Sequence, residues 1–121
     1  MVLGASLNKD RYSNKAIRLL REHHHEVIAI GLREGEVSDV SLRTDRPIVK
    51  ELDTVTLYLG PKNQKPFEQY ILDLAPKRVI FNPGTEHLTF QERLQKAGIS
   101  CEIACTLVLL RTHQFETLLN E

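Results

Sequence analysis

The sequence predicts a three-layer α/β fold, in which a mainly parallel sheet of about five strands is flanked by helices. Short β-branched and apolar segments alternate with amphipathic helical segments along the 121 residues. This alternation is typical of parallel strands joined by right-handed crossovers. The strand segments are apolar throughout, as expected when helices cover both faces of the sheet. At 41% apolar residues, the chain can bury a core of its own.

Five segments are predicted as strands because each is short, apolar and followed by a turn or a polar stretch. They are Val2–Ala5, Glu26–Ile30, Thr54–Leu59, Arg78–Phe81 and Ile99–Ile103. The stretch Leu32–Lys50 is polar and of mixed charge, so we predict a long connection there, with a short extra strand at Pro47–Val49. A connection of this length is more often functional or partly structured than idle.

Four helices are predicted from apolar residues at i, i+3, i+4 and i+7 and from their end signals. They are Asn14–His23, Phe67–Leu74, a helix that starts near Thr89 and stops at Gly98, and a final helix within Thr106–Leu119. Ser13 is the expected N-cap of the first helix. Thr89 and Glu92 have the spacing of a capping box. The order of elements predicts one Rossmann-like domain over residues 1–121.

Charge and composition narrow the classes of partner. Sixteen basic and sixteen acidic residues cancel, so no global field favours nucleic acid or a membrane surface. No apolar run approaches the roughly 20 residues that span a bilayer, and the N-terminus lacks the pattern of a signal peptide. Cys101 and Cys105 provide no disulfide framework. A cytoplasmic location is therefore expected.

A ligand site is expected at the carboxyl ends of the strands, where a sheet of this kind binds its ligands. The loops that follow the first four predicted parallel strands meet at that edge. Three of them combine glycine, which lets backbone approach a ligand closely, with a neighbouring polar residue or proline. The four loops are Gly4–Ser6, Gly31–Arg33, Leu59–Pro61 and Asn82–Thr85.

The first two loops indicate an anionic ligand. Gly4 is the only glycine of the first loop, which therefore lacks the G-x-G-x-x-G fingerprint. Ser6 and Ser13 can still donate hydrogen bonds to a diphosphate and Arg11 can add a charge-assisted contact, although an ordinary strand-to-helix turn explains the same residues. After the second strand, Arg33 stands where an NAD-dependent enzyme has a carboxylate. A guanidinium suits a ribose phosphate, as in NADP and coenzyme A, unless it is only a solvated charge.

Four segments together resemble the small stand-alone CoA-binding domain proteins, whose fold is similar to that of the CoA-binding domain of the succinyl-CoA synthetase α subunit. They are Val2–Ser6 with Arg11–Ser13, Val55–Leu59, Val79–Glu86 and Ala104–Val108. The resemblance implies CoA lying across the carboxyl edge of the sheet. It implies a phosphate-side loop of Gly4, Ala5, Ser6, Arg11, Tyr12 and Ser13, an adenosine end at Arg33, and edge contacts from Leu59, Gly60, Asn82, Pro83 and Gly84. The synthetase's phosphohistidine loop and nucleotide-grasp domain are absent, so the resemblance implies binding rather than ligase chemistry.

Other reactive residues have simpler structural interpretations. The run His23–His25 ends a predicted helix, where histidine suits the helix dipole, and adjacent residues rarely share one metal ion. Cys101 is expected to pack as a small hydrophobe. Cys105 begins the last helix near the ligand edge, so a mixed disulfide with the CoA thiol is a minor alternative. Glu86 and His87 could act as acid and base, but no nucleophile or substrate is indicated beside them.

The preferred hypothesis is non-catalytic binding of coenzyme A or an acyl-CoA, with no metal. The first alternative is an NADP- or other nucleotide-dependent enzyme, which the missing fingerprint and the lack of a hydride-acceptor site disfavour. The second is a regulatory domain that acts through a protein partner. The apolar run Thr106–Leu110 could be buried in the domain or in a homodimer.

Overall fold

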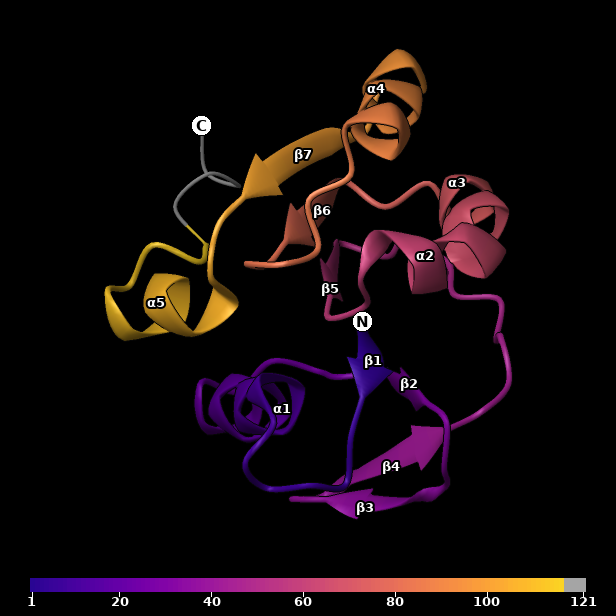
Figure 1. Ribbon diagram of the computed structural model, residues 1–121. Helices are drawn as coiled ribbons and strands as arrows, with labels where there is room; N and C mark the ends of the chain where they lie inside the picture. Colours follow the sequence, from indigo (N-terminus) through magenta and orange to yellow (C-terminus); the bar gives the residue numbers. More distant parts are fainter. Residues whose placement is uncertain (117–121) are drawn as a thin grey trace.

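A mostly parallel sheet of seven strands forms the middle of the molecule in the computed structural model, which describes residues 1–116 (Figure 1). The strand order is β3-β4-β2-β1-β5-β6-β7. Every neighbouring pair is parallel except β3 and β4, which are antiparallel. The strands are β1 Val2–Ala5, β2 Ala29–Gly31, β3 Gly35–Val37, β4 Val40–Arg43, β5 Thr54–Leu57, β6 Arg78–Phe81 and β7 Ser100–Ile103. The predicted α/β architecture is confirmed, with seven strands instead of five.

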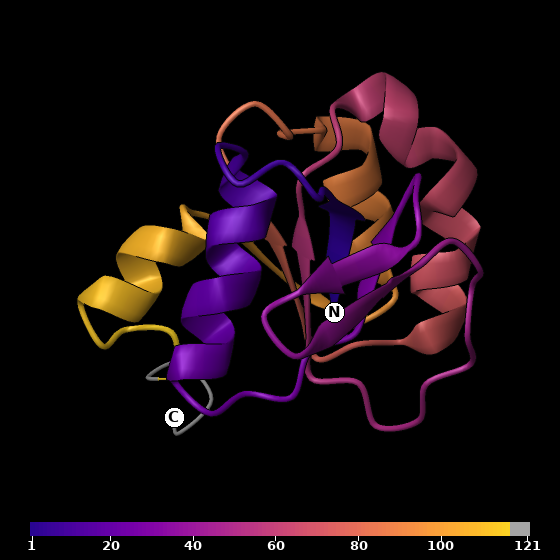
Figure 2. The ribbon, with the colours of Figure 1, turned by 90° about the horizontal axis from the view of Figure 1, so that it is seen from below.

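Helices cover both faces of this sheet. They are α1 Tyr12–Glu22, α2 Pro61–Gln64, the 3-10 helix η1 Lys65–Phe67, α3 Glu68–Leu74, α4 Leu88–Lys96 and α5 Thr106–Arg111. In Figures 1 and 2, α1 and α5 lie on one face, and α3 and α4 lie on the other. The three layers follow from the apolar strands, since each face of the sheet must be covered.

The core accordingly has two halves, one on each face of the sheet. Between the sheet and α1 and α5, Ile17 and Leu110 pack against strand residues such as Ile80. On the opposite face, Phe90 and Leu94 of α4 pack against the other side of the strands. The run Thr106–Leu110 belongs to the first half, because all its residues except the half-exposed Val108 are buried within the domain.

The strand order reverses beside β1, and this determines where a cleft can form. From β1 the chain passes to β2 on one side, and it later returns to β5 on the other side of β1. The connections that leave the carboxyl ends of β1 and β5 therefore run to opposite faces of the sheet, which opens a crevice between them. Leu3 of β1 pairs with both Ile30 of β2 and Leu57 of β5, so the three strands end at about the same level.

The predicted long connection Leu32–Lys50 contains a β-hairpin instead. Strands β3 and β4 pair antiparallel across a tight turn in which Ser38 has a φ of 56°. Val40 and Leu42 point inward and alternate with exposed polar residues, and both join the core half beneath α1. This is the alternation of a strand with one buried face. The extra strand predicted at Pro47–Val49 is wrong, because that segment has no regular structure.

Two predicted helix starts are also wrong. Helix α1 begins at Tyr12, one residue before Ser13, and Ser13 lies buried inside its first turn rather than capping it. At α4 the N-cap is His87, whose Nδ1 accepts a hydrogen bond from the amide of Phe90 at 3.0 Å. The Gln91 side chain in turn accepts from the His87 amide at 3.1 Å. His87 and Gln91 therefore cap the N-terminus of α4 in place of the predicted pair, Thr89 and Glu92.

The predicted C-terminal ends of the helices agree with the structure better than the predicted starts do. Gly98 follows α4 with a φ of 82°, which confirms the predicted stop, since this left-handed conformation favours glycine. The final helix α5 ends at Arg111, and the last residues of the predicted range, through Leu119, lie outside the described part of the chain. Within residues 1–116, no helix has the length and apolar character that crossing a bilayer requires.

Candidate functional site

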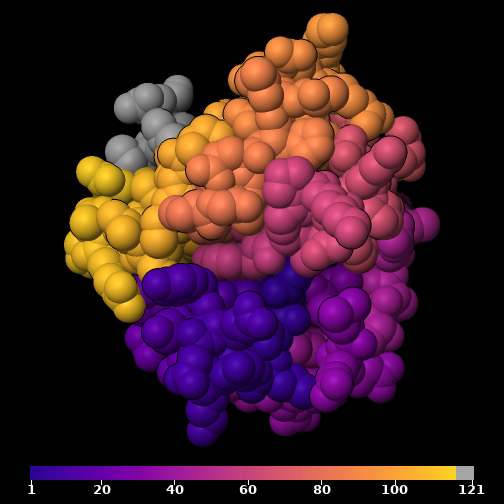
Figure 3. Space-filling view, viewed as in Figure 1, coloured from indigo at the N-terminus to yellow at the C-terminus, as the bar shows by residue number. Residues whose placement is uncertain are grey.

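A cleft of about 580 Å³ opens at the carboxyl ends of β1, β2, β5 and β6. Figure 3 shows one face of the molecule, on which the segment after β1 (indigo) meets the segments after β5 and β6 (rose to orange). Such a volume is ordinary for a small-molecule site. The lining residues are Gly4, Ala5, Ser6, Leu7, Asn8, Arg11, Tyr12, Ser13, Ile30, Gly31, Leu32, Arg33, Tyr58, Leu59, Gly60, Phe67, Pro83, Gly84 and Thr85.

The structure brings the sequence-predicted site residues together with one exception. Those that line the cleft are Gly4, Ala5, Ser6, Arg11, Tyr12, Ser13, Arg33, Leu59, Gly60, Pro83 and Gly84. Asn82 is not among them, because its side chain is buried behind the cleft. Four further lining residues, which were not predicted as ligand contacts, carry aromatic or polar side chains: Asn8, Tyr58, Phe67 and Thr85.

Arg11 and Arg33 are the charged side chains among the described residues that line the cleft. Both are exposed, and neither makes a hydrogen bond or an ion pair with another described side chain. Among the ion pairs of the described residues, none joins Arg33 to its neighbour Glu34. No carboxylate lies among the lining residues that the structure describes. The cleft therefore carries uncompensated positive charge in a protein without net charge, which favours an anionic ligand.

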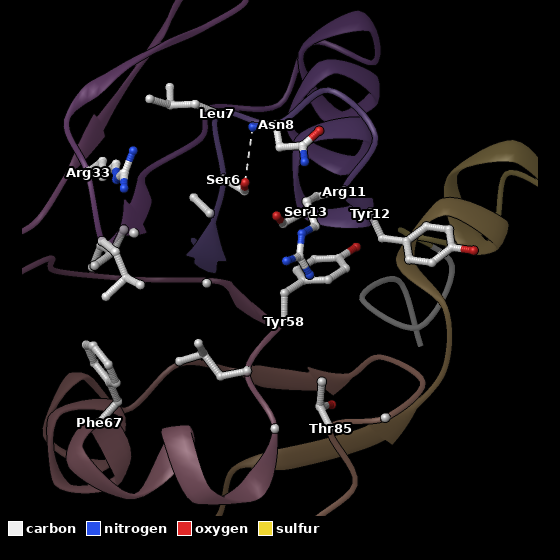
Figure 4. Close-up of a pocket in the computed structure, with 18 of the residues that line it drawn as sticks. Ser6, Leu7, Asn8, Arg11, Tyr12, Ser13, Arg33, Tyr58, Phe67 and Thr85 are labelled. Atoms are coloured by element: carbon white, nitrogen blue, oxygen red, sulfur yellow. Dashed lines mark hydrogen bonds between the residues drawn. The ribbon is translucent and has the colours of Figure 1, made fainter.

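The loop after β1 is held by its own polar side chains. Gly4 has a φ of 96°, and a Cβ atom there would lie 2.9 Å from the backbone of Tyr58, so glycine allows β1 to approach the loop after β5. Ser6 Oγ accepts a hydrogen bond from the amide of Asn8 (Figure 4), and Asn14 Nδ2 donates to the Ser6 carbonyl at 2.9 Å. This loop is thus preorganised before any ligand arrives.

Gln64 ties together the two loops on the opposite side of the cleft. Its Nε2 donates to the carbonyl of Leu59 at 2.7 Å and to the carbonyl of Thr85 at 2.6 Å. The side chain is fully buried. Sequence reasoning missed it because Gln64 lies in a polar run and shows no pattern of burial. The amide positions the loops after β5 and β6 relative to each other.

Replacing Gln64 with glutamate is expected to loosen this side of the cleft. A carboxylate would face two carbonyl oxygens and could donate to at most one of them, and only when protonated. The loss of a buried donor predicts a decrease of about 1–3 kcal/mol in the free energy of unfolding. Denaturant unfolding measures it, with Asn63→Asp, an exposed amide in the same helix, as control. Equal decreases for the two substitutions would contradict the role of Gln64 in joining the two loops.

Asn82 plays a similar role behind the cleft. Its Nδ2 donates to Thr56 Oγ1 at 2.7 Å and to the Leu57 carbonyl at 2.8 Å, and its Oδ1 accepts from the amide of Thr106 at 2.8 Å. These bonds join β5, β6 and the start of α5. Asn82 therefore anchors the loop that carries Pro83 and Gly84, and it does not itself face the cleft.

Comparison with protein families identifies the chain. The family model described as CoA binding domain matches residues 1–111. The chain belongs to this family. No protein with a curated description matches it.

Solved structures of similar proteins support this CoA-binding domain fold. A crystal structure of an uncharacterized protein is 46% identical, with a TM-score of 0.91 and 94% of each chain covered. A Thermus thermophilus protein, cell-free ID.343, is 25% identical, with a TM-score of 0.81 and coverage of 94% of this chain and 87% of that one. Prb, a protein redesigned for binding, is also 25% identical, with a TM-score of 0.78 and coverage of 99% and 82%.

Tyr58 contributes a buried hydroxyl group at the wall of the CoA-binding domain's cleft. Among residues 1–116 this hydroxyl finds no hydrogen bond of normal geometry, although Thr56 and Thr106 lie beside it. Burial, as the main cause, raises the pKa of Tyr58 to about 12. The phenol therefore remains neutral at physiological pH, and it adds no charge to the cleft.

The other reactive residues of this CoA-binding domain serve structure or lie apart from the cleft. Cys105 precedes α5 and is not among the described lining residues. Burial raises the pKa of the Cys101 thiol to about 11, so it is a neutral, packed side chain. His25 lies 3.0 Å from Glu116, and His87 caps α4. The described residues contain no His, Cys, Asp or Glu cluster that could hold a metal ion.

Proposed function

We propose that this protein binds coenzyme A or an acyl-CoA in the cleft at the carboxyl edge of its sheet and catalyses no reaction there. Two observations carry the proposal. Arg11 and Arg33 make no hydrogen bond or ion pair with another side chain among residues 1–116, and the described lining of the cleft includes no carboxylate. A CoA-binding domain with such a cleft can satisfy both guanidinium groups with ligand phosphates.

The two arginines suggest how the ligand lies. Arg11 stands at the start of α1 beside the preorganised loop after β1, where backbone amides and the helix N-terminus favour a diphosphate. Arg33 follows β2 and is suited to the phosphate on the ribose. The pantetheine arm would then run along Leu59 and Gly60 toward Pro83 and Gly84, which close the cleft without adding charge.

The lining supports binding over catalysis. Among the described residues of the cleft there is no His, Cys, Lys, Asp or Glu, the usual general acids and bases. Burial raises the pKa of Tyr58 to about 12, which makes its phenol a weaker acid than usual, and no base contacts Ser6 or Ser13 in the hydrogen bonds that the structure describes. Nothing in the lining would activate a nucleophile or take a proton from a thioester ligand.

Calorimetric titration with CoA, acetyl-CoA, NADP and ATP tests the proposal. We expect saturable binding of CoA or acetyl-CoA that is at least about tenfold tighter than binding of NADP, since only the CoA ligands combine the ribose phosphate with a pantetheine arm. Tighter binding of NADP would instead favour the nucleotide-dependent enzyme. Failure of all four ligands to bind would contradict the proposal and favour a regulatory domain that acts through a protein partner.

A further inference from the structure

Phe67 presents an aromatic ring to the end of the cleft where Arg33 lies. It is the last residue of η1 and is half-buried, packed partly against the core. Figure 4 shows its side chain projecting from this short helix into the space opposite Arg33. Phe67 has no polar atom, so what it offers to a ligand in the cleft is the face or the edge of its ring.

One face of this ring is already occupied by a cation. The Cζ atom of Arg46 lies 4.2 Å from the centroid of the Phe67 ring, a distance at which a guanidinium and an aromatic face attract each other. Nη1 of Arg46 also donates to the carbonyl of Pro66 at 2.7 Å. Arg46 itself is not among the lining residues, whereas Phe67 is. The guanidinium therefore backs the ring from outside the cleft and holds it in one orientation.

The neighbourhood of this ring is apolar as well as cationic. Leu32 lines the same cleft next to Arg33 in sequence, and its side chain is 97% exposed, without packing of its own. Leu32 therefore offers an apolar surface to a ligand that lies at this end of the cleft, next to the ring of Phe67. Leu32, Phe67 and Arg33 together suit a flat heterocycle that carries a phosphate close by, which describes a phosphorylated nucleoside better than an acyl chain.

The other two aromatic side chains of the cleft are less suited to this role. Tyr12 is 67% exposed at the opposite end, beside Arg11, and Lys15 lies over its ring at 5.4 Å. Tyr58 has a buried hydroxyl and belongs to the cleft's inner wall. Phe67 alone of the three combines a fixed ring with a position at the Arg33 end.

We propose that the adenine base of CoA stacks on the cleft-facing side of the Phe67 ring, and that Arg46 is a positioning residue that holds this ring from behind. The inference rests on the proposed function and adds the base subsite to it. The ribose phosphate then lies within reach of Arg33, and the pantetheine arm extends away from Phe67 along Leu59 and Gly60.

Fluorescence of Phe67→Trp provides a direct test, because the natural chain contains no tryptophan and the substitution introduces a single one. An indole stacked on adenine loses emission. We expect CoA and adenosine 3′,5′-bisphosphate to quench this fluorescence and 4′-phosphopantetheine, which lacks the nucleoside, to leave it unchanged. The matched control is Tyr12→Trp at the other end. Quenching by adenosine bisphosphate in the control but not in Phe67→Trp would overturn the subsite.

Affinities measured by calorimetry provide a second test. Base–aromatic stacking predicts that Phe67→Leu, which keeps an apolar side chain but no ring, weakens CoA binding about tenfold and leaves 4′-phosphopantetheine unaffected. Phe67→Ala should act in the same way, and thermal melting checks that both variants fold. Equal losses for the two ligands would show that Phe67 only shapes the cleft, which would contradict base stacking.

The role of Arg46 is tested by a double-mutant cycle. Arg46→Ala is expected to weaken CoA binding about twofold to fivefold, as the loss of an exposed cation–π contact predicts. The same substitution should have no effect in the Phe67→Leu background, because it acts through the ring. An equal loss in both backgrounds would contradict the positioning role. If the unmodified chain binds no CoA, the proposed function itself is wrong. If it binds CoA but the Phe67 and Arg46 variants do not change the affinity as expected, only the proposed adenine subsite is wrong.

Discussion

Replacing Arg33 with alanine is expected to weaken CoA binding by about tenfold or more and to leave the affinity for dephospho-CoA unchanged, because a charge-assisted hydrogen bond contributes about 1.5–3 kcal/mol. Dephospho-CoA lacks the phosphate on the ribose, so it has no group for this guanidinium. Arg33 is exposed and its side chain makes no hydrogen bond or ion pair with another described residue, so the substitution should not disturb folding. Calorimetric titration of both ligands measures the two affinities.

Arg11→Ala is the companion variant, and its expected pattern differs. Since we assign Arg11 to the diphosphate that both ligands carry, its loss should weaken both by a similar factor. Arg111→Ala removes an exposed arginine of α5 that is not among the lining residues and serves as the control for net charge. If Arg33→Ala weakened dephospho-CoA as much as CoA, the assignment of this residue to the ribose phosphate would be wrong.

The second large effect is expected from Gly31→Ala, at the end of β2. A Cβ atom at Gly31 would lie only 2.3 Å from the carbonyl oxygen of Ala5, a backbone atom that pairs with β2 and cannot turn aside. Strands β1 and β2 would have to move apart at Ala5 and Gly31, which line the cleft. Overpacking of this kind costs about 1–3 kcal/mol, and each kcal/mol lowers the melting temperature by roughly 4 °C in a domain of this size.

Gly60→Ala is the matched control for that substitution. Gly60 also lines the cleft, but an added Cβ there meets nothing within 4 Å, and its φ is −64°. We expect Gly60→Ala to leave the melting temperature within about 2 °C of the unmodified protein, since the conformation suits any residue. Thermal unfolding and CoA titration of both variants distinguish the two glycines. Equal melting temperatures for both variants would show that the sheet absorbs the contact.

The parallel strands were predictable from local sequence because each is buried on both faces. Arg78–Phe81 and Val2–Ala5 are apolar for nearly their whole length, and the structure has both with the predicted bounds. The hairpin within Leu32–Lys50 was missed because its strands are short and half polar. Only packing beneath α1 makes Val40 and Leu42 recognisable as core residues. Helix caps were missed for a similar reason, since His87 is a rare N-cap that depends on Gln91.

The candidate site was predictable where it depends on loops at strand ends. Gly4, Arg11 and Arg33 lie in such loops, and the parallel arrangement of the strands brings their loops to one edge. Gln64 and Phe67 were not predictable as site residues, because the local sequence around them indicates only the start of a helix. Their roles arise from contacts with Thr85 and Arg46, which are 21 residues away in each case.

The sequence by itself determined the α/β class, the sheet edge proposed to bind a ligand and the presence of Arg33 where an NAD-dependent enzyme has a carboxylate, because these follow from strand burial and local residue order. Only the tertiary structure decided that Arg11 and Arg33 make no ion pair with another described residue, that Asn82 faces inward and that Phe67 faces the cleft. The physical reason is that charge pairing and side-chain direction depend on neighbours that are distant in the chain, whereas the strand pattern depends on adjacent residues.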